Sequence, residues 1–274
     1  MRARRKRRGR RALVVLLLLL GLAVADSNYR LVTTTYVLGG PTLPEAFDGF
    51  RVLQLSDVHG AVYGADNARL LAAARAAAPD LIALTGDLAD KDTDMAELET
   101  LLTGLTAIAP VYYVSGNHEW ADRRLSELIP LLEGLGVRYL RNESLTLERE
   151  GQSIVLIGVE DPFGPADMPK PDAVAAAAPE GFRLLLGHRN DLTEKYPDLA
   201  VDVALTGHAH GGVWRIPGLG GLFDHGRKLF PGSGTEGVVT SGRLHMVVSR
   251  GIGNTPPLLR LGNNPELVVV ELRK

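Results

Sequence analysis

The sequence predicts an α/β domain with two β-sheets and outer helices, which follows a basic and apolar N-terminal segment. Three observations lead to this fold class. Short runs of branched apolar residues alternate with alanine- and leucine-rich segments in the first half of the chain. The second half is richer in strand-like runs. No internal repeat or inner linker divides the chain, so we expect residues 1–26 to be a leader or anchor and residues 27–274 to be the domain.

The composition excludes several classes of site and partner. The chain has no cysteine, which rules out disulfides, thiolate metal ligands and a cysteine nucleophile. Eight Lys and Arg residues lie within residues 1–11, which leaves 22 of the 30 basic residues against all 32 acidic ones, a net charge of −10. A body this acidic is a poor partner for nucleic acid, so we expect no nucleic-acid binding.

Residues 12–25 are uncharged and apolar, and they directly follow the basic run. Fourteen residues are fewer than the ~20 that span a bilayer, and their number suits the core of a signal peptide. Ala23-Val24-Ala25 offers a cleavage site, whereas a retained anchor requires flanking residues to reach the interface. Both alternatives stay open. Both place the domain outside the cytoplasmic membrane, because the positive charge stays inside.

The expected elements of the first half follow from local composition. β-branched residues predict a strand at 30–38, and a turn-rich loop separates it from the next strand, Val52–Leu55. Alanine content predicts a helix at 67–78, with a proline directly after it. We then expect a strand at 80–87, a helix at 93–107, a strand at 111–118 and a helix at 125–136 that contains Pro130.

The second half is expected to be mostly strands and loops. Paired strands at 138–147 and 152–159 flank a turn at 149–151. Residues 160–180 read as a loop with a short alanine helix, and residues 211–236 as a long glycine-rich loop near the site. Further strands are expected at 182–186, 201–205, 244–249 and 266–272.

Polar side chains follow five of the expected strands, at the point where each strand ends. In open α/β sheets this carboxyl edge is where ligands bind. Carboxylate, amide and imidazole groups suit manganese, iron or zinc. A single Asp-x-His pair could be ordinary loop residues, but the repeated pattern favours a metal site. The residues are Asp57 and His59, Asp87, Asn117 and His118, His188, and His208 and His210.

Two further histidines lie outside this pattern. His245 falls within an expected strand and is predicted to be structural. His225 lies in the glycine-rich loop and is a candidate for substrate contact, since loops over a site often carry function.

The motifs resemble, in order, the signature of the calcineurin-like metallophosphoesterases within residues 50–212. The N-terminal segment and the final SRGIG…PEL are similar to a membrane-associated bacterial branch, which includes enzymes that cleave UDP-2,3-diacylglucosamine. The resemblance implies a four-layer sandwich of two mixed β-sheets flanked by helices. The blocks that carry it are Asp57-x-His59, Gly86-Asp87, Gly116-Asn117-His118-Glu119, His188 and Gly207-His208-x-His210.

The resemblance also implies a centre of two divalent metal ions. Asp57, His59 and His210 would hold one ion, and Asn117, His188 and His208 the other. Asp87 would bridge the two ions. His118 would act on the substrate as the proton donor to the leaving group, with Asp90 orienting its ring.

The implied reaction is hydrolysis of a phosphomonoester or phosphodiester, with a cell-envelope or lipid-linked molecule as the expected substrate. Two cations neutralise the phosphate and lower the pKa of the attacking water. A non-catalytic binding module on the same fold is the alternative. A third reading, a mononuclear metal hydrolase that cleaves amides, is disfavoured because the sequence does not contain the His-Glu-x-x-His spacing. The chain departs from the sequence pattern of the membrane-associated bacterial branch at Ala209 and at Arg189-Asn190. The sequence does not predict an oligomeric state.

Overall fold

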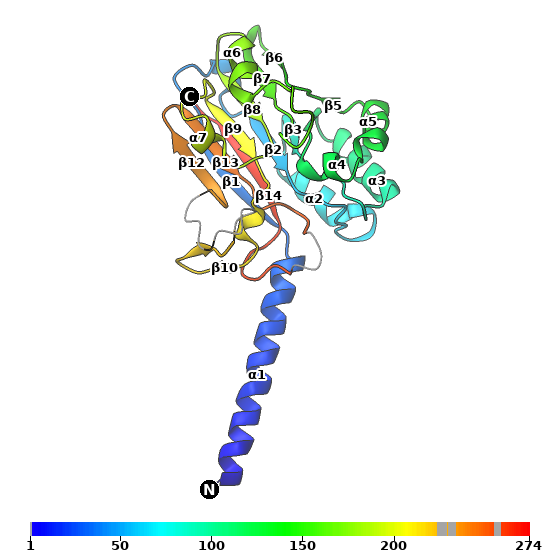
Figure 1. Cartoon of the computed structure of the whole chain (residues 1–274), viewed down its shortest axis with the longest axis vertical. Coiled ribbons are helices and arrows are strands. Elements are labelled where there is room, and N and C mark those ends of the chain that lie inside the picture. The colour runs from blue at the N-terminus through cyan, green and yellow to red at the C-terminus, as the bar shows by residue number, and fades with distance from the viewer. Residues whose placement is uncertain (1, 224–228, 230–233, 255–258) are drawn as a thin grey trace.

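A computed structural model describes residues 2–223, 229, 234–254 and 259–274 of the chain. Two six-stranded mixed sheets pack together, and helices cover their outer faces (Figure 1). The predicted fold class is therefore confirmed.

The first sheet contains the strands that lead to Asp57, Asp87 and Asn117. Strands β2 to β5 run parallel, and β14 lies antiparallel to β2 and parallel to β1. In spatial order the strands are β1 (Val32–Leu38), β14 (Glu266–Leu272), β2 (Arg51–Leu55), β3 (Leu81–Thr85), β4 (Val111–Val114) and β5 (Arg138–Tyr139). The helices on its outer face include α2 (Ala68–Ala76), α3 (Met95–Thr106) and α5 (Leu125–Gly134).

The second sheet contains the strands that lead to His188 and His208. Its four inner strands run parallel, and each edge strand is antiparallel to its neighbour. In spatial order they are β12 (Gly237–Ser241), β13 (Leu244–Val248), β9 (Val203–Thr206), β8 (Arg183–Leu186), β7 (Gln152–Gly158) and β6 (Glu143–Arg149). Its outer face carries α6 (Pro171–Ala177) and α7 (Leu192–Lys195).

Three apolar layers hold these four layers of structure together. Alternate residues of a strand point to opposite faces, so Leu53 and Leu55 pack against the helices of the first sheet. Val52 packs instead against the second sheet, where it meets residues such as Leu205. One polar side chain crosses this middle layer. The buried Gln54 amide donates to Thr85 and to the carbonyl of Thr206, which joins β2 to β9.

Several elements differ from the expectation in ways that the packing explains. The expected strand at 138–147 is two strands in different sheets, because Leu140 is buried between the sheets and Asn142 turns the chain with a φ of 54°. The strand expected at 111–118 ends at Val114, and a short helix, α4 (Asn117–Ala121), begins at the site. The expected loop at 211–236 contains the hairpin of β10 (Arg215–Ile216) and β11 (Gly220–Gly221).

The N-terminal segment forms a single long helix, α1 (Arg2–Tyr29), that projects away from the sheets (Figure 1). Within it, residues 9–29 contain an 18-residue stretch with a mean hydropathy of 2.0 and form a helix long and apolar enough to cross a membrane. A signal sequence has the same properties, so the structure leaves both alternatives open.

Replacing Leu205 with alanine should test the layer between the sheets. Leu205 is fully buried, so we expect a loss of about 2–5 kcal/mol in the free energy of unfolding, from lost burial and the cavity left behind. Urea unfolding of the detergent-solubilised chain measures it. The control is Leu219→Ala, at a leucine that is 62% exposed, where we expect a change within about 0.5 kcal/mol. Similar losses in both variants would contradict this packing.

Candidate metal centre

The site begins with Asp57, which follows β2 and reaches across to the second sheet. Its carboxylate accepts the hydroxyl of Ser56 at 2.6 Å and the backbone N–H of His208 at 3.1 Å. A side chain at Gly207 would place its Cβ only 1.9 Å from Ser56 Oγ and 2.3 Å from Asp57 Oδ2. The absence of a side chain at Gly207 therefore allows the two sheets to meet at Asp57.

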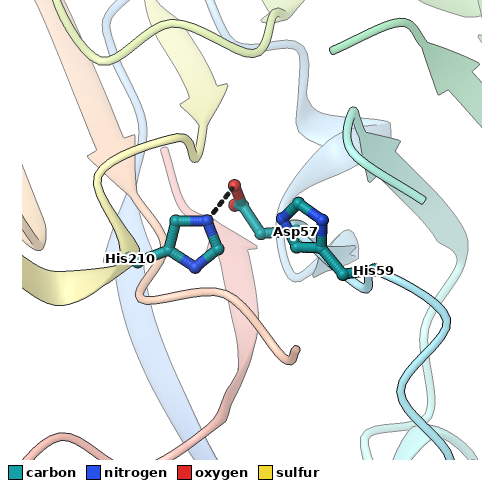
Figure 2. Close-up of side chains that lie close together, drawn as sticks. All are labelled: Asp57, His59 and His210. Atoms are coloured by element: carbon teal, nitrogen blue, oxygen red, sulfur yellow. Dashed lines mark ion pairs between the residues drawn. The ribbon is translucent and has the colours of Figure 1, made fainter. Parts of the chain in front are cut away.

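A first cluster of possible metal ligands forms at this meeting point. Asp57, His59 and His210 each offer an atom within 4.8 Å of the others, and all three side chains are buried (Figure 2). Nε2 of His210 lies 3.4 Å from Oδ1 of Asp57, and the rings of His59 and His210 stack with centroids 5.1 Å apart. The three side chains come from two different sheets and converge on one point.

A second cluster surrounds Nε2 of His188. That nitrogen lies 3.2 Å from Oδ1 of Asn117, 3.2 Å from Oδ2 of Asp87 and 3.1 Å from Nδ1 of His208. Ligand atoms of a tetrahedral zinc site lie about 3.3 Å apart, as metal–nitrogen bonds of about 2.0–2.1 Å require. The distances from Nε2 of His188 to its three neighbours are therefore those found between ligands of one metal ion.

Asp87 lies between the two clusters. The Oδ2 atom that approaches His188 is also 3.7 Å from Nε2 of His59, and its Oδ1 accepts the backbone N–H of His118 at 2.9 Å. One carboxylate oxygen thus faces ligands of both groups. This is the position that a bridging ligand needs.

The donor atoms fit divalent cations. His188 makes a 2.9 Å contact from Nδ1 to the carbonyl of Thr85, which fixes the proton on Nδ1 and leaves the Nε2 lone pair for a metal. Nε2 of His59 is buried and has no hydrogen-bond partner among the described residues. A cation would satisfy that nitrogen. Imidazole, carboxylate and amide oxygen are ligands that manganese, iron and zinc share.

Five of the seven candidate ligands adopt a left-handed backbone conformation. A positive φ is uncommon for a residue with a side chain, and it persists only where the surroundings impose it. Here each strand turns sharply at its end to direct a ligand inward. The residues are Asp57 (51°), His59 (47°), Asp87 (52°), His208 (67°) and His210 (45°).

Glu119 holds two of these turns together. Its fully buried carboxylate accepts the backbone N–H groups of Asp87, Leu88 and Ala89 at 2.5–3.1 Å, and that of Gly116 at 2.8 Å. The turns after β3 and β4 therefore share one anchor. Burial and the charge of Asp87 raise the pKa of Glu119 to about 7. The backbone N–H groups act in the opposite direction, because they stabilise the ionised carboxylate.

The carboxylate beside His118 is not the one that the sequence suggested. Asp90 contacts His59, with its Oδ2 3.4 Å from Nδ1, whereas Nδ1 of His118 lies 3.3 Å from Oδ2 of Asp122. The reason is helical spacing. His118 opens α4, and Asp122 is four residues later, one turn away on the same side. The expectation that Asp90 orients His118 is thus corrected.

Opposite charges perturb the titration of the buried groups. Burial alone would raise the pKa of Asp87, but His188 and His59 lower it well below its usual range. Burial alone would lower the pKa of His188, but the charge of Asp87 raises it to about 10. Burial alone would raise the pKa of Asp90, but hydrogen bonds from His59, the Asp92 backbone N–H and Thr93 together lower it to about 2. The site therefore favours positive charge beside Asp87.

Arg189, one of the two departures from the branch, lies at the edge of the second cluster. Its guanidinium forms a two-point ion pair with the buried Asp161, at 2.6 and 3.0 Å, and Nη1 contacts Nε2 of His208 at 2.6 Å. Arg189 and His188 also line a pocket of about 220 Å³. The other walls of the pocket come from residues 159–171 and from α7.

Sequence reasoning missed Asp122, Asp161 and the anchoring role of Glu119. Asp122 could have been found from its spacing to His118, but nothing local marks Asp161. His245 lies on β13 and contacts the hydroxyl of Thr240 on β12, which is consistent with the structural role predicted for it. His225 lies outside the described residues.

Comparison with known proteins agrees with this geometry. A family model described as calcineurin-like phosphoesterase matches residues 50–212. The chain is 28% identical to the uncharacterized metallophosphoesterase YkuE of Bacillus subtilis, over 89% of this chain and 86% of that one. It is 31% identical to phosphodiesterase YaeI of Escherichia coli, over 71% and 70%. It is 27% identical to a zebrafish (Danio rerio) transmembrane protein with a metallophosphoesterase domain, over 62% and 42%.

The family model covers more than half of the chain, and the residues it spans include all seven candidate ligands. The chain is therefore a hydrolase that acts on phosphoesters, and it belongs to the calcineurin-like phosphoesterase family.

Proposed function

We propose that this protein hydrolyses an envelope or lipid-linked phosphoester with the help of two divalent cations. Asp57, His59 and His210 would hold one cation, and Asn117, His188 and His208 the other, with Asp87 between them. The observation that carries the proposal is the position of Asp87, whose Oδ2 faces a histidine of each cluster. When bound, the cations supply charge neutralisation for the phosphoryl group and lower the pKa of water.

Charge balance supports an anionic substrate. Two divalent cations bring four positive charges, and the directly coordinating carboxylates, Asp57 and Asp87, bring two negative charges, which leaves about +2. Such a centre attracts a phosphoester anion more strongly than a neutral amide. The guanidinium of Arg189 lies at the edge of the site, and the buried Asp161 that pairs with it holds it there.

His118 is proposed as the proton donor to the leaving oxygen, and Asp122 as the residue that orients it. His118 lies beside both clusters, and its ring is 4.8 Å from that of His59. Its side chain is about a quarter exposed, unlike the buried ligands. A group that exchanges protons with substrate and solvent requires that access.

The class of substrate is inferred from the pocket beside His188 and from α1. Apolar side chains such as Val159, Met168 and Leu192 line the pocket, together with Lys170, while Lys195 is paired with Asp191 at 2.8 Å. An apolar wall with cationic groups suits an amphiphilic phosphoester. The α1 helix would bring the protein to the membrane, and the eight basic residues at its N-terminal end would keep the catalytic body on the outer side.

Asp87→Asn should abolish hydrolysis of bis(p-nitrophenyl) phosphate in the presence of Mn²⁺, Fe²⁺ or Zn²⁺. A neutral amide cannot hold two cations together, so bound metal measured by mass spectrometry should fall as well. The matched control is Asp172→Asn, at an exposed aspartate on α6 away from both clusters, which should keep wild-type activity. Wild-type turnover in the Asp87 variant would refute the assignment of this residue.

His118→Ala should lower kcat by roughly 10²- to 10⁴-fold while bound metal stays near the wild-type content, because the side chain is proposed to move a proton. Asp122→Asn should lower kcat less, since it removes only the partner of the ring. Steady-state kinetics combined with metal analysis separates the roles. Equal loss of metal and turnover in His118→Ala would identify His118 as a ligand.

Glu119→Gln should weaken metal binding by roughly 10- to 100-fold, a typical cost of losing a group that supports metal ligands. The amide nitrogen of glutamine cannot accept the backbone N–H groups that converge on Glu119, so the Asp87 turn loses its anchor. Titration with Mn²⁺ measures the affinity. Glu180→Gln, at a fully exposed side chain, is the control. An unchanged affinity in Glu119→Gln would show that the turns hold their conformation without the anchor.

A further inference from the structure

Exposed apolar side chains collect where α1 meets the catalytic body. Soluble surfaces carry single exposed apolar residues, but a contiguous group of them indicates an interaction site. We name this group the apolar rim. Its members and exposed fractions are Tyr29 (70%), Val62 (45%), Trp214 (45%), Ile216 (40%), Leu219 (62%) and Leu259 (60%).

One hydrogen bond and one pocket join four of the six members of the apolar rim. The indole N–H of Trp214 donates to the carbonyl of Leu259 at 2.8 Å. Leu259, Val62 and Tyr29 line one pocket of about 340 Å³. Ile216 and Leu219 belong to the β10–β11 hairpin that begins after Trp214, at the end of the molecule from which α1 projects (Figure 1).

The end of α1 is bonded to the catalytic body, so the direction of the helix relative to the rim is set. Asn28 exchanges two hydrogen bonds with the backbone of Arg260, at 2.9 and 3.0 Å. The buried Ser27 accepts the N–H of Gly262, and Asn264 donates to the carbonyl of Asp26. The three α1 residues of this junction, Asp26, Ser27 and Asn28, all follow the possible cleavage site at Ala25.

The geometry of α1 gives the depth of the rim. The candidate span Gly9–Tyr29 has 21 residues and is about 32 Å long at 1.5 Å per residue. Its uncharged apolar core, residues 12–25, covers about 21 Å of that length, and Tyr29 lies four residues, about 6 Å, beyond the core. Tyr29, at the end of the span, would therefore lie at the head-group level, where Tyr and Trp are enriched. Arg69 donates to the carbonyl of Tyr29, so a cation lies at the same level, where anionic lipid phosphates would be.

The rim and the candidate metal centre share one scaffold. The β10–β11 hairpin follows His210 directly, and Asn263 donates both to the carbonyl of His210 at 2.7 Å and to that of Val213 at 3.0 Å. A guanidinium nitrogen of Arg260 lies 3.5 Å from Nδ1 of His210. The loops that carry the rim therefore also position a candidate ligand.

We propose that the apolar rim inserts into the interface of the bilayer that α1 enters, and that it holds the metal centre against the lipid head-group layer. The partner is a lipid surface, and the substrate it selects is a phosphoester carried in that layer. The selection of substrate rests on the proposed function. The insertion of the rim does not, because it follows from the exposure of the rim and from α1 being retained as the membrane anchor.

Trp214 provides a direct probe, since Trp120 is the only other tryptophan. The full chain is reconstituted in phosphatidylcholine vesicles with plain or brominated acyl chains, and tryptophan emission is compared. Trp120 lies on α4, beside Ser115 and away from the rim. We expect brominated chains to quench about half or more of the emission of Trp120→Phe, and little of the emission of Trp214→Phe. Equal emission of Trp120→Phe in both vesicles would overturn the proposal.

Charge substitution tests the rim without disturbing the core. Ile216→Asp with Leu219→Asp should remove most of the Trp214 quenching while the melting temperature is unchanged, because both side chains are exposed. Val37→Asp, at an exposed valine on β1 outside the rim, should leave the quenching at the wild-type value. Unchanged quenching in the double variant would refute insertion. So would quenching of Trp214 that falls as protein concentration rises, because a dimer contact would then cover Trp214 instead of lipid. Because no substrate is used, this result does not depend on whether the protein hydrolyses phosphoesters.

Discussion

The hydrogen bonds from the backbone N–H of His208 to the Asp57 carboxylate are the contact on which the site depends. They join the end of a strand in one sheet to the end of a strand in the other, across a position where only glycine fits. Without that approach, His188 and His208 would stay with the second sheet and Asp57 and Asp87 with the first. Neither cluster would then be complete, since each draws ligands from both sheets.

The surrounding fold imposes an unfavourable local conformation on the ligands and compensates for it with buried hydrogen bonds. Left-handed turns at five candidate ligands cost of order 1–3 kcal/mol each. Glu119 offsets part of this cost at the Asp87 turn, because its carboxylate satisfies four buried N–H groups that would otherwise lack partners. The donors are therefore oriented by the protein, and a cation need not reorganise the loops in order to bind.

The position of the site at one end of the sandwich links it to the N-terminal helix. The carboxyl ends of the parallel strands, the β10–β11 hairpin and the last turn of α1 lie within the same network of loops, through Arg260 and Asn263. A phosphoesterase built in this way can present its metal centre to a surface rather than to bulk solvent. The body carries a net negative charge, so anionic lipid repels it. It can therefore lie against such a surface only where a cation or an apolar contact offsets the repulsion.

Local patterns were sufficient to predict the fold class and the residues that gather at the strand ends. Apolar runs encode strands through neighbouring residues, and a polar residue directly after such a run is carried to the sheet edge whatever the topology. Local sequence patterns could not predict the contacts between segments that are far apart in the chain. Asp90 beside His59, Asp161 beside Arg189 and the change of sheet at Asn142 depend on how layers pack, which brings together residues with no sequence relationship. The apolar rim belongs to the same group, because its members come from four separate segments and only the folded chain makes them neighbours.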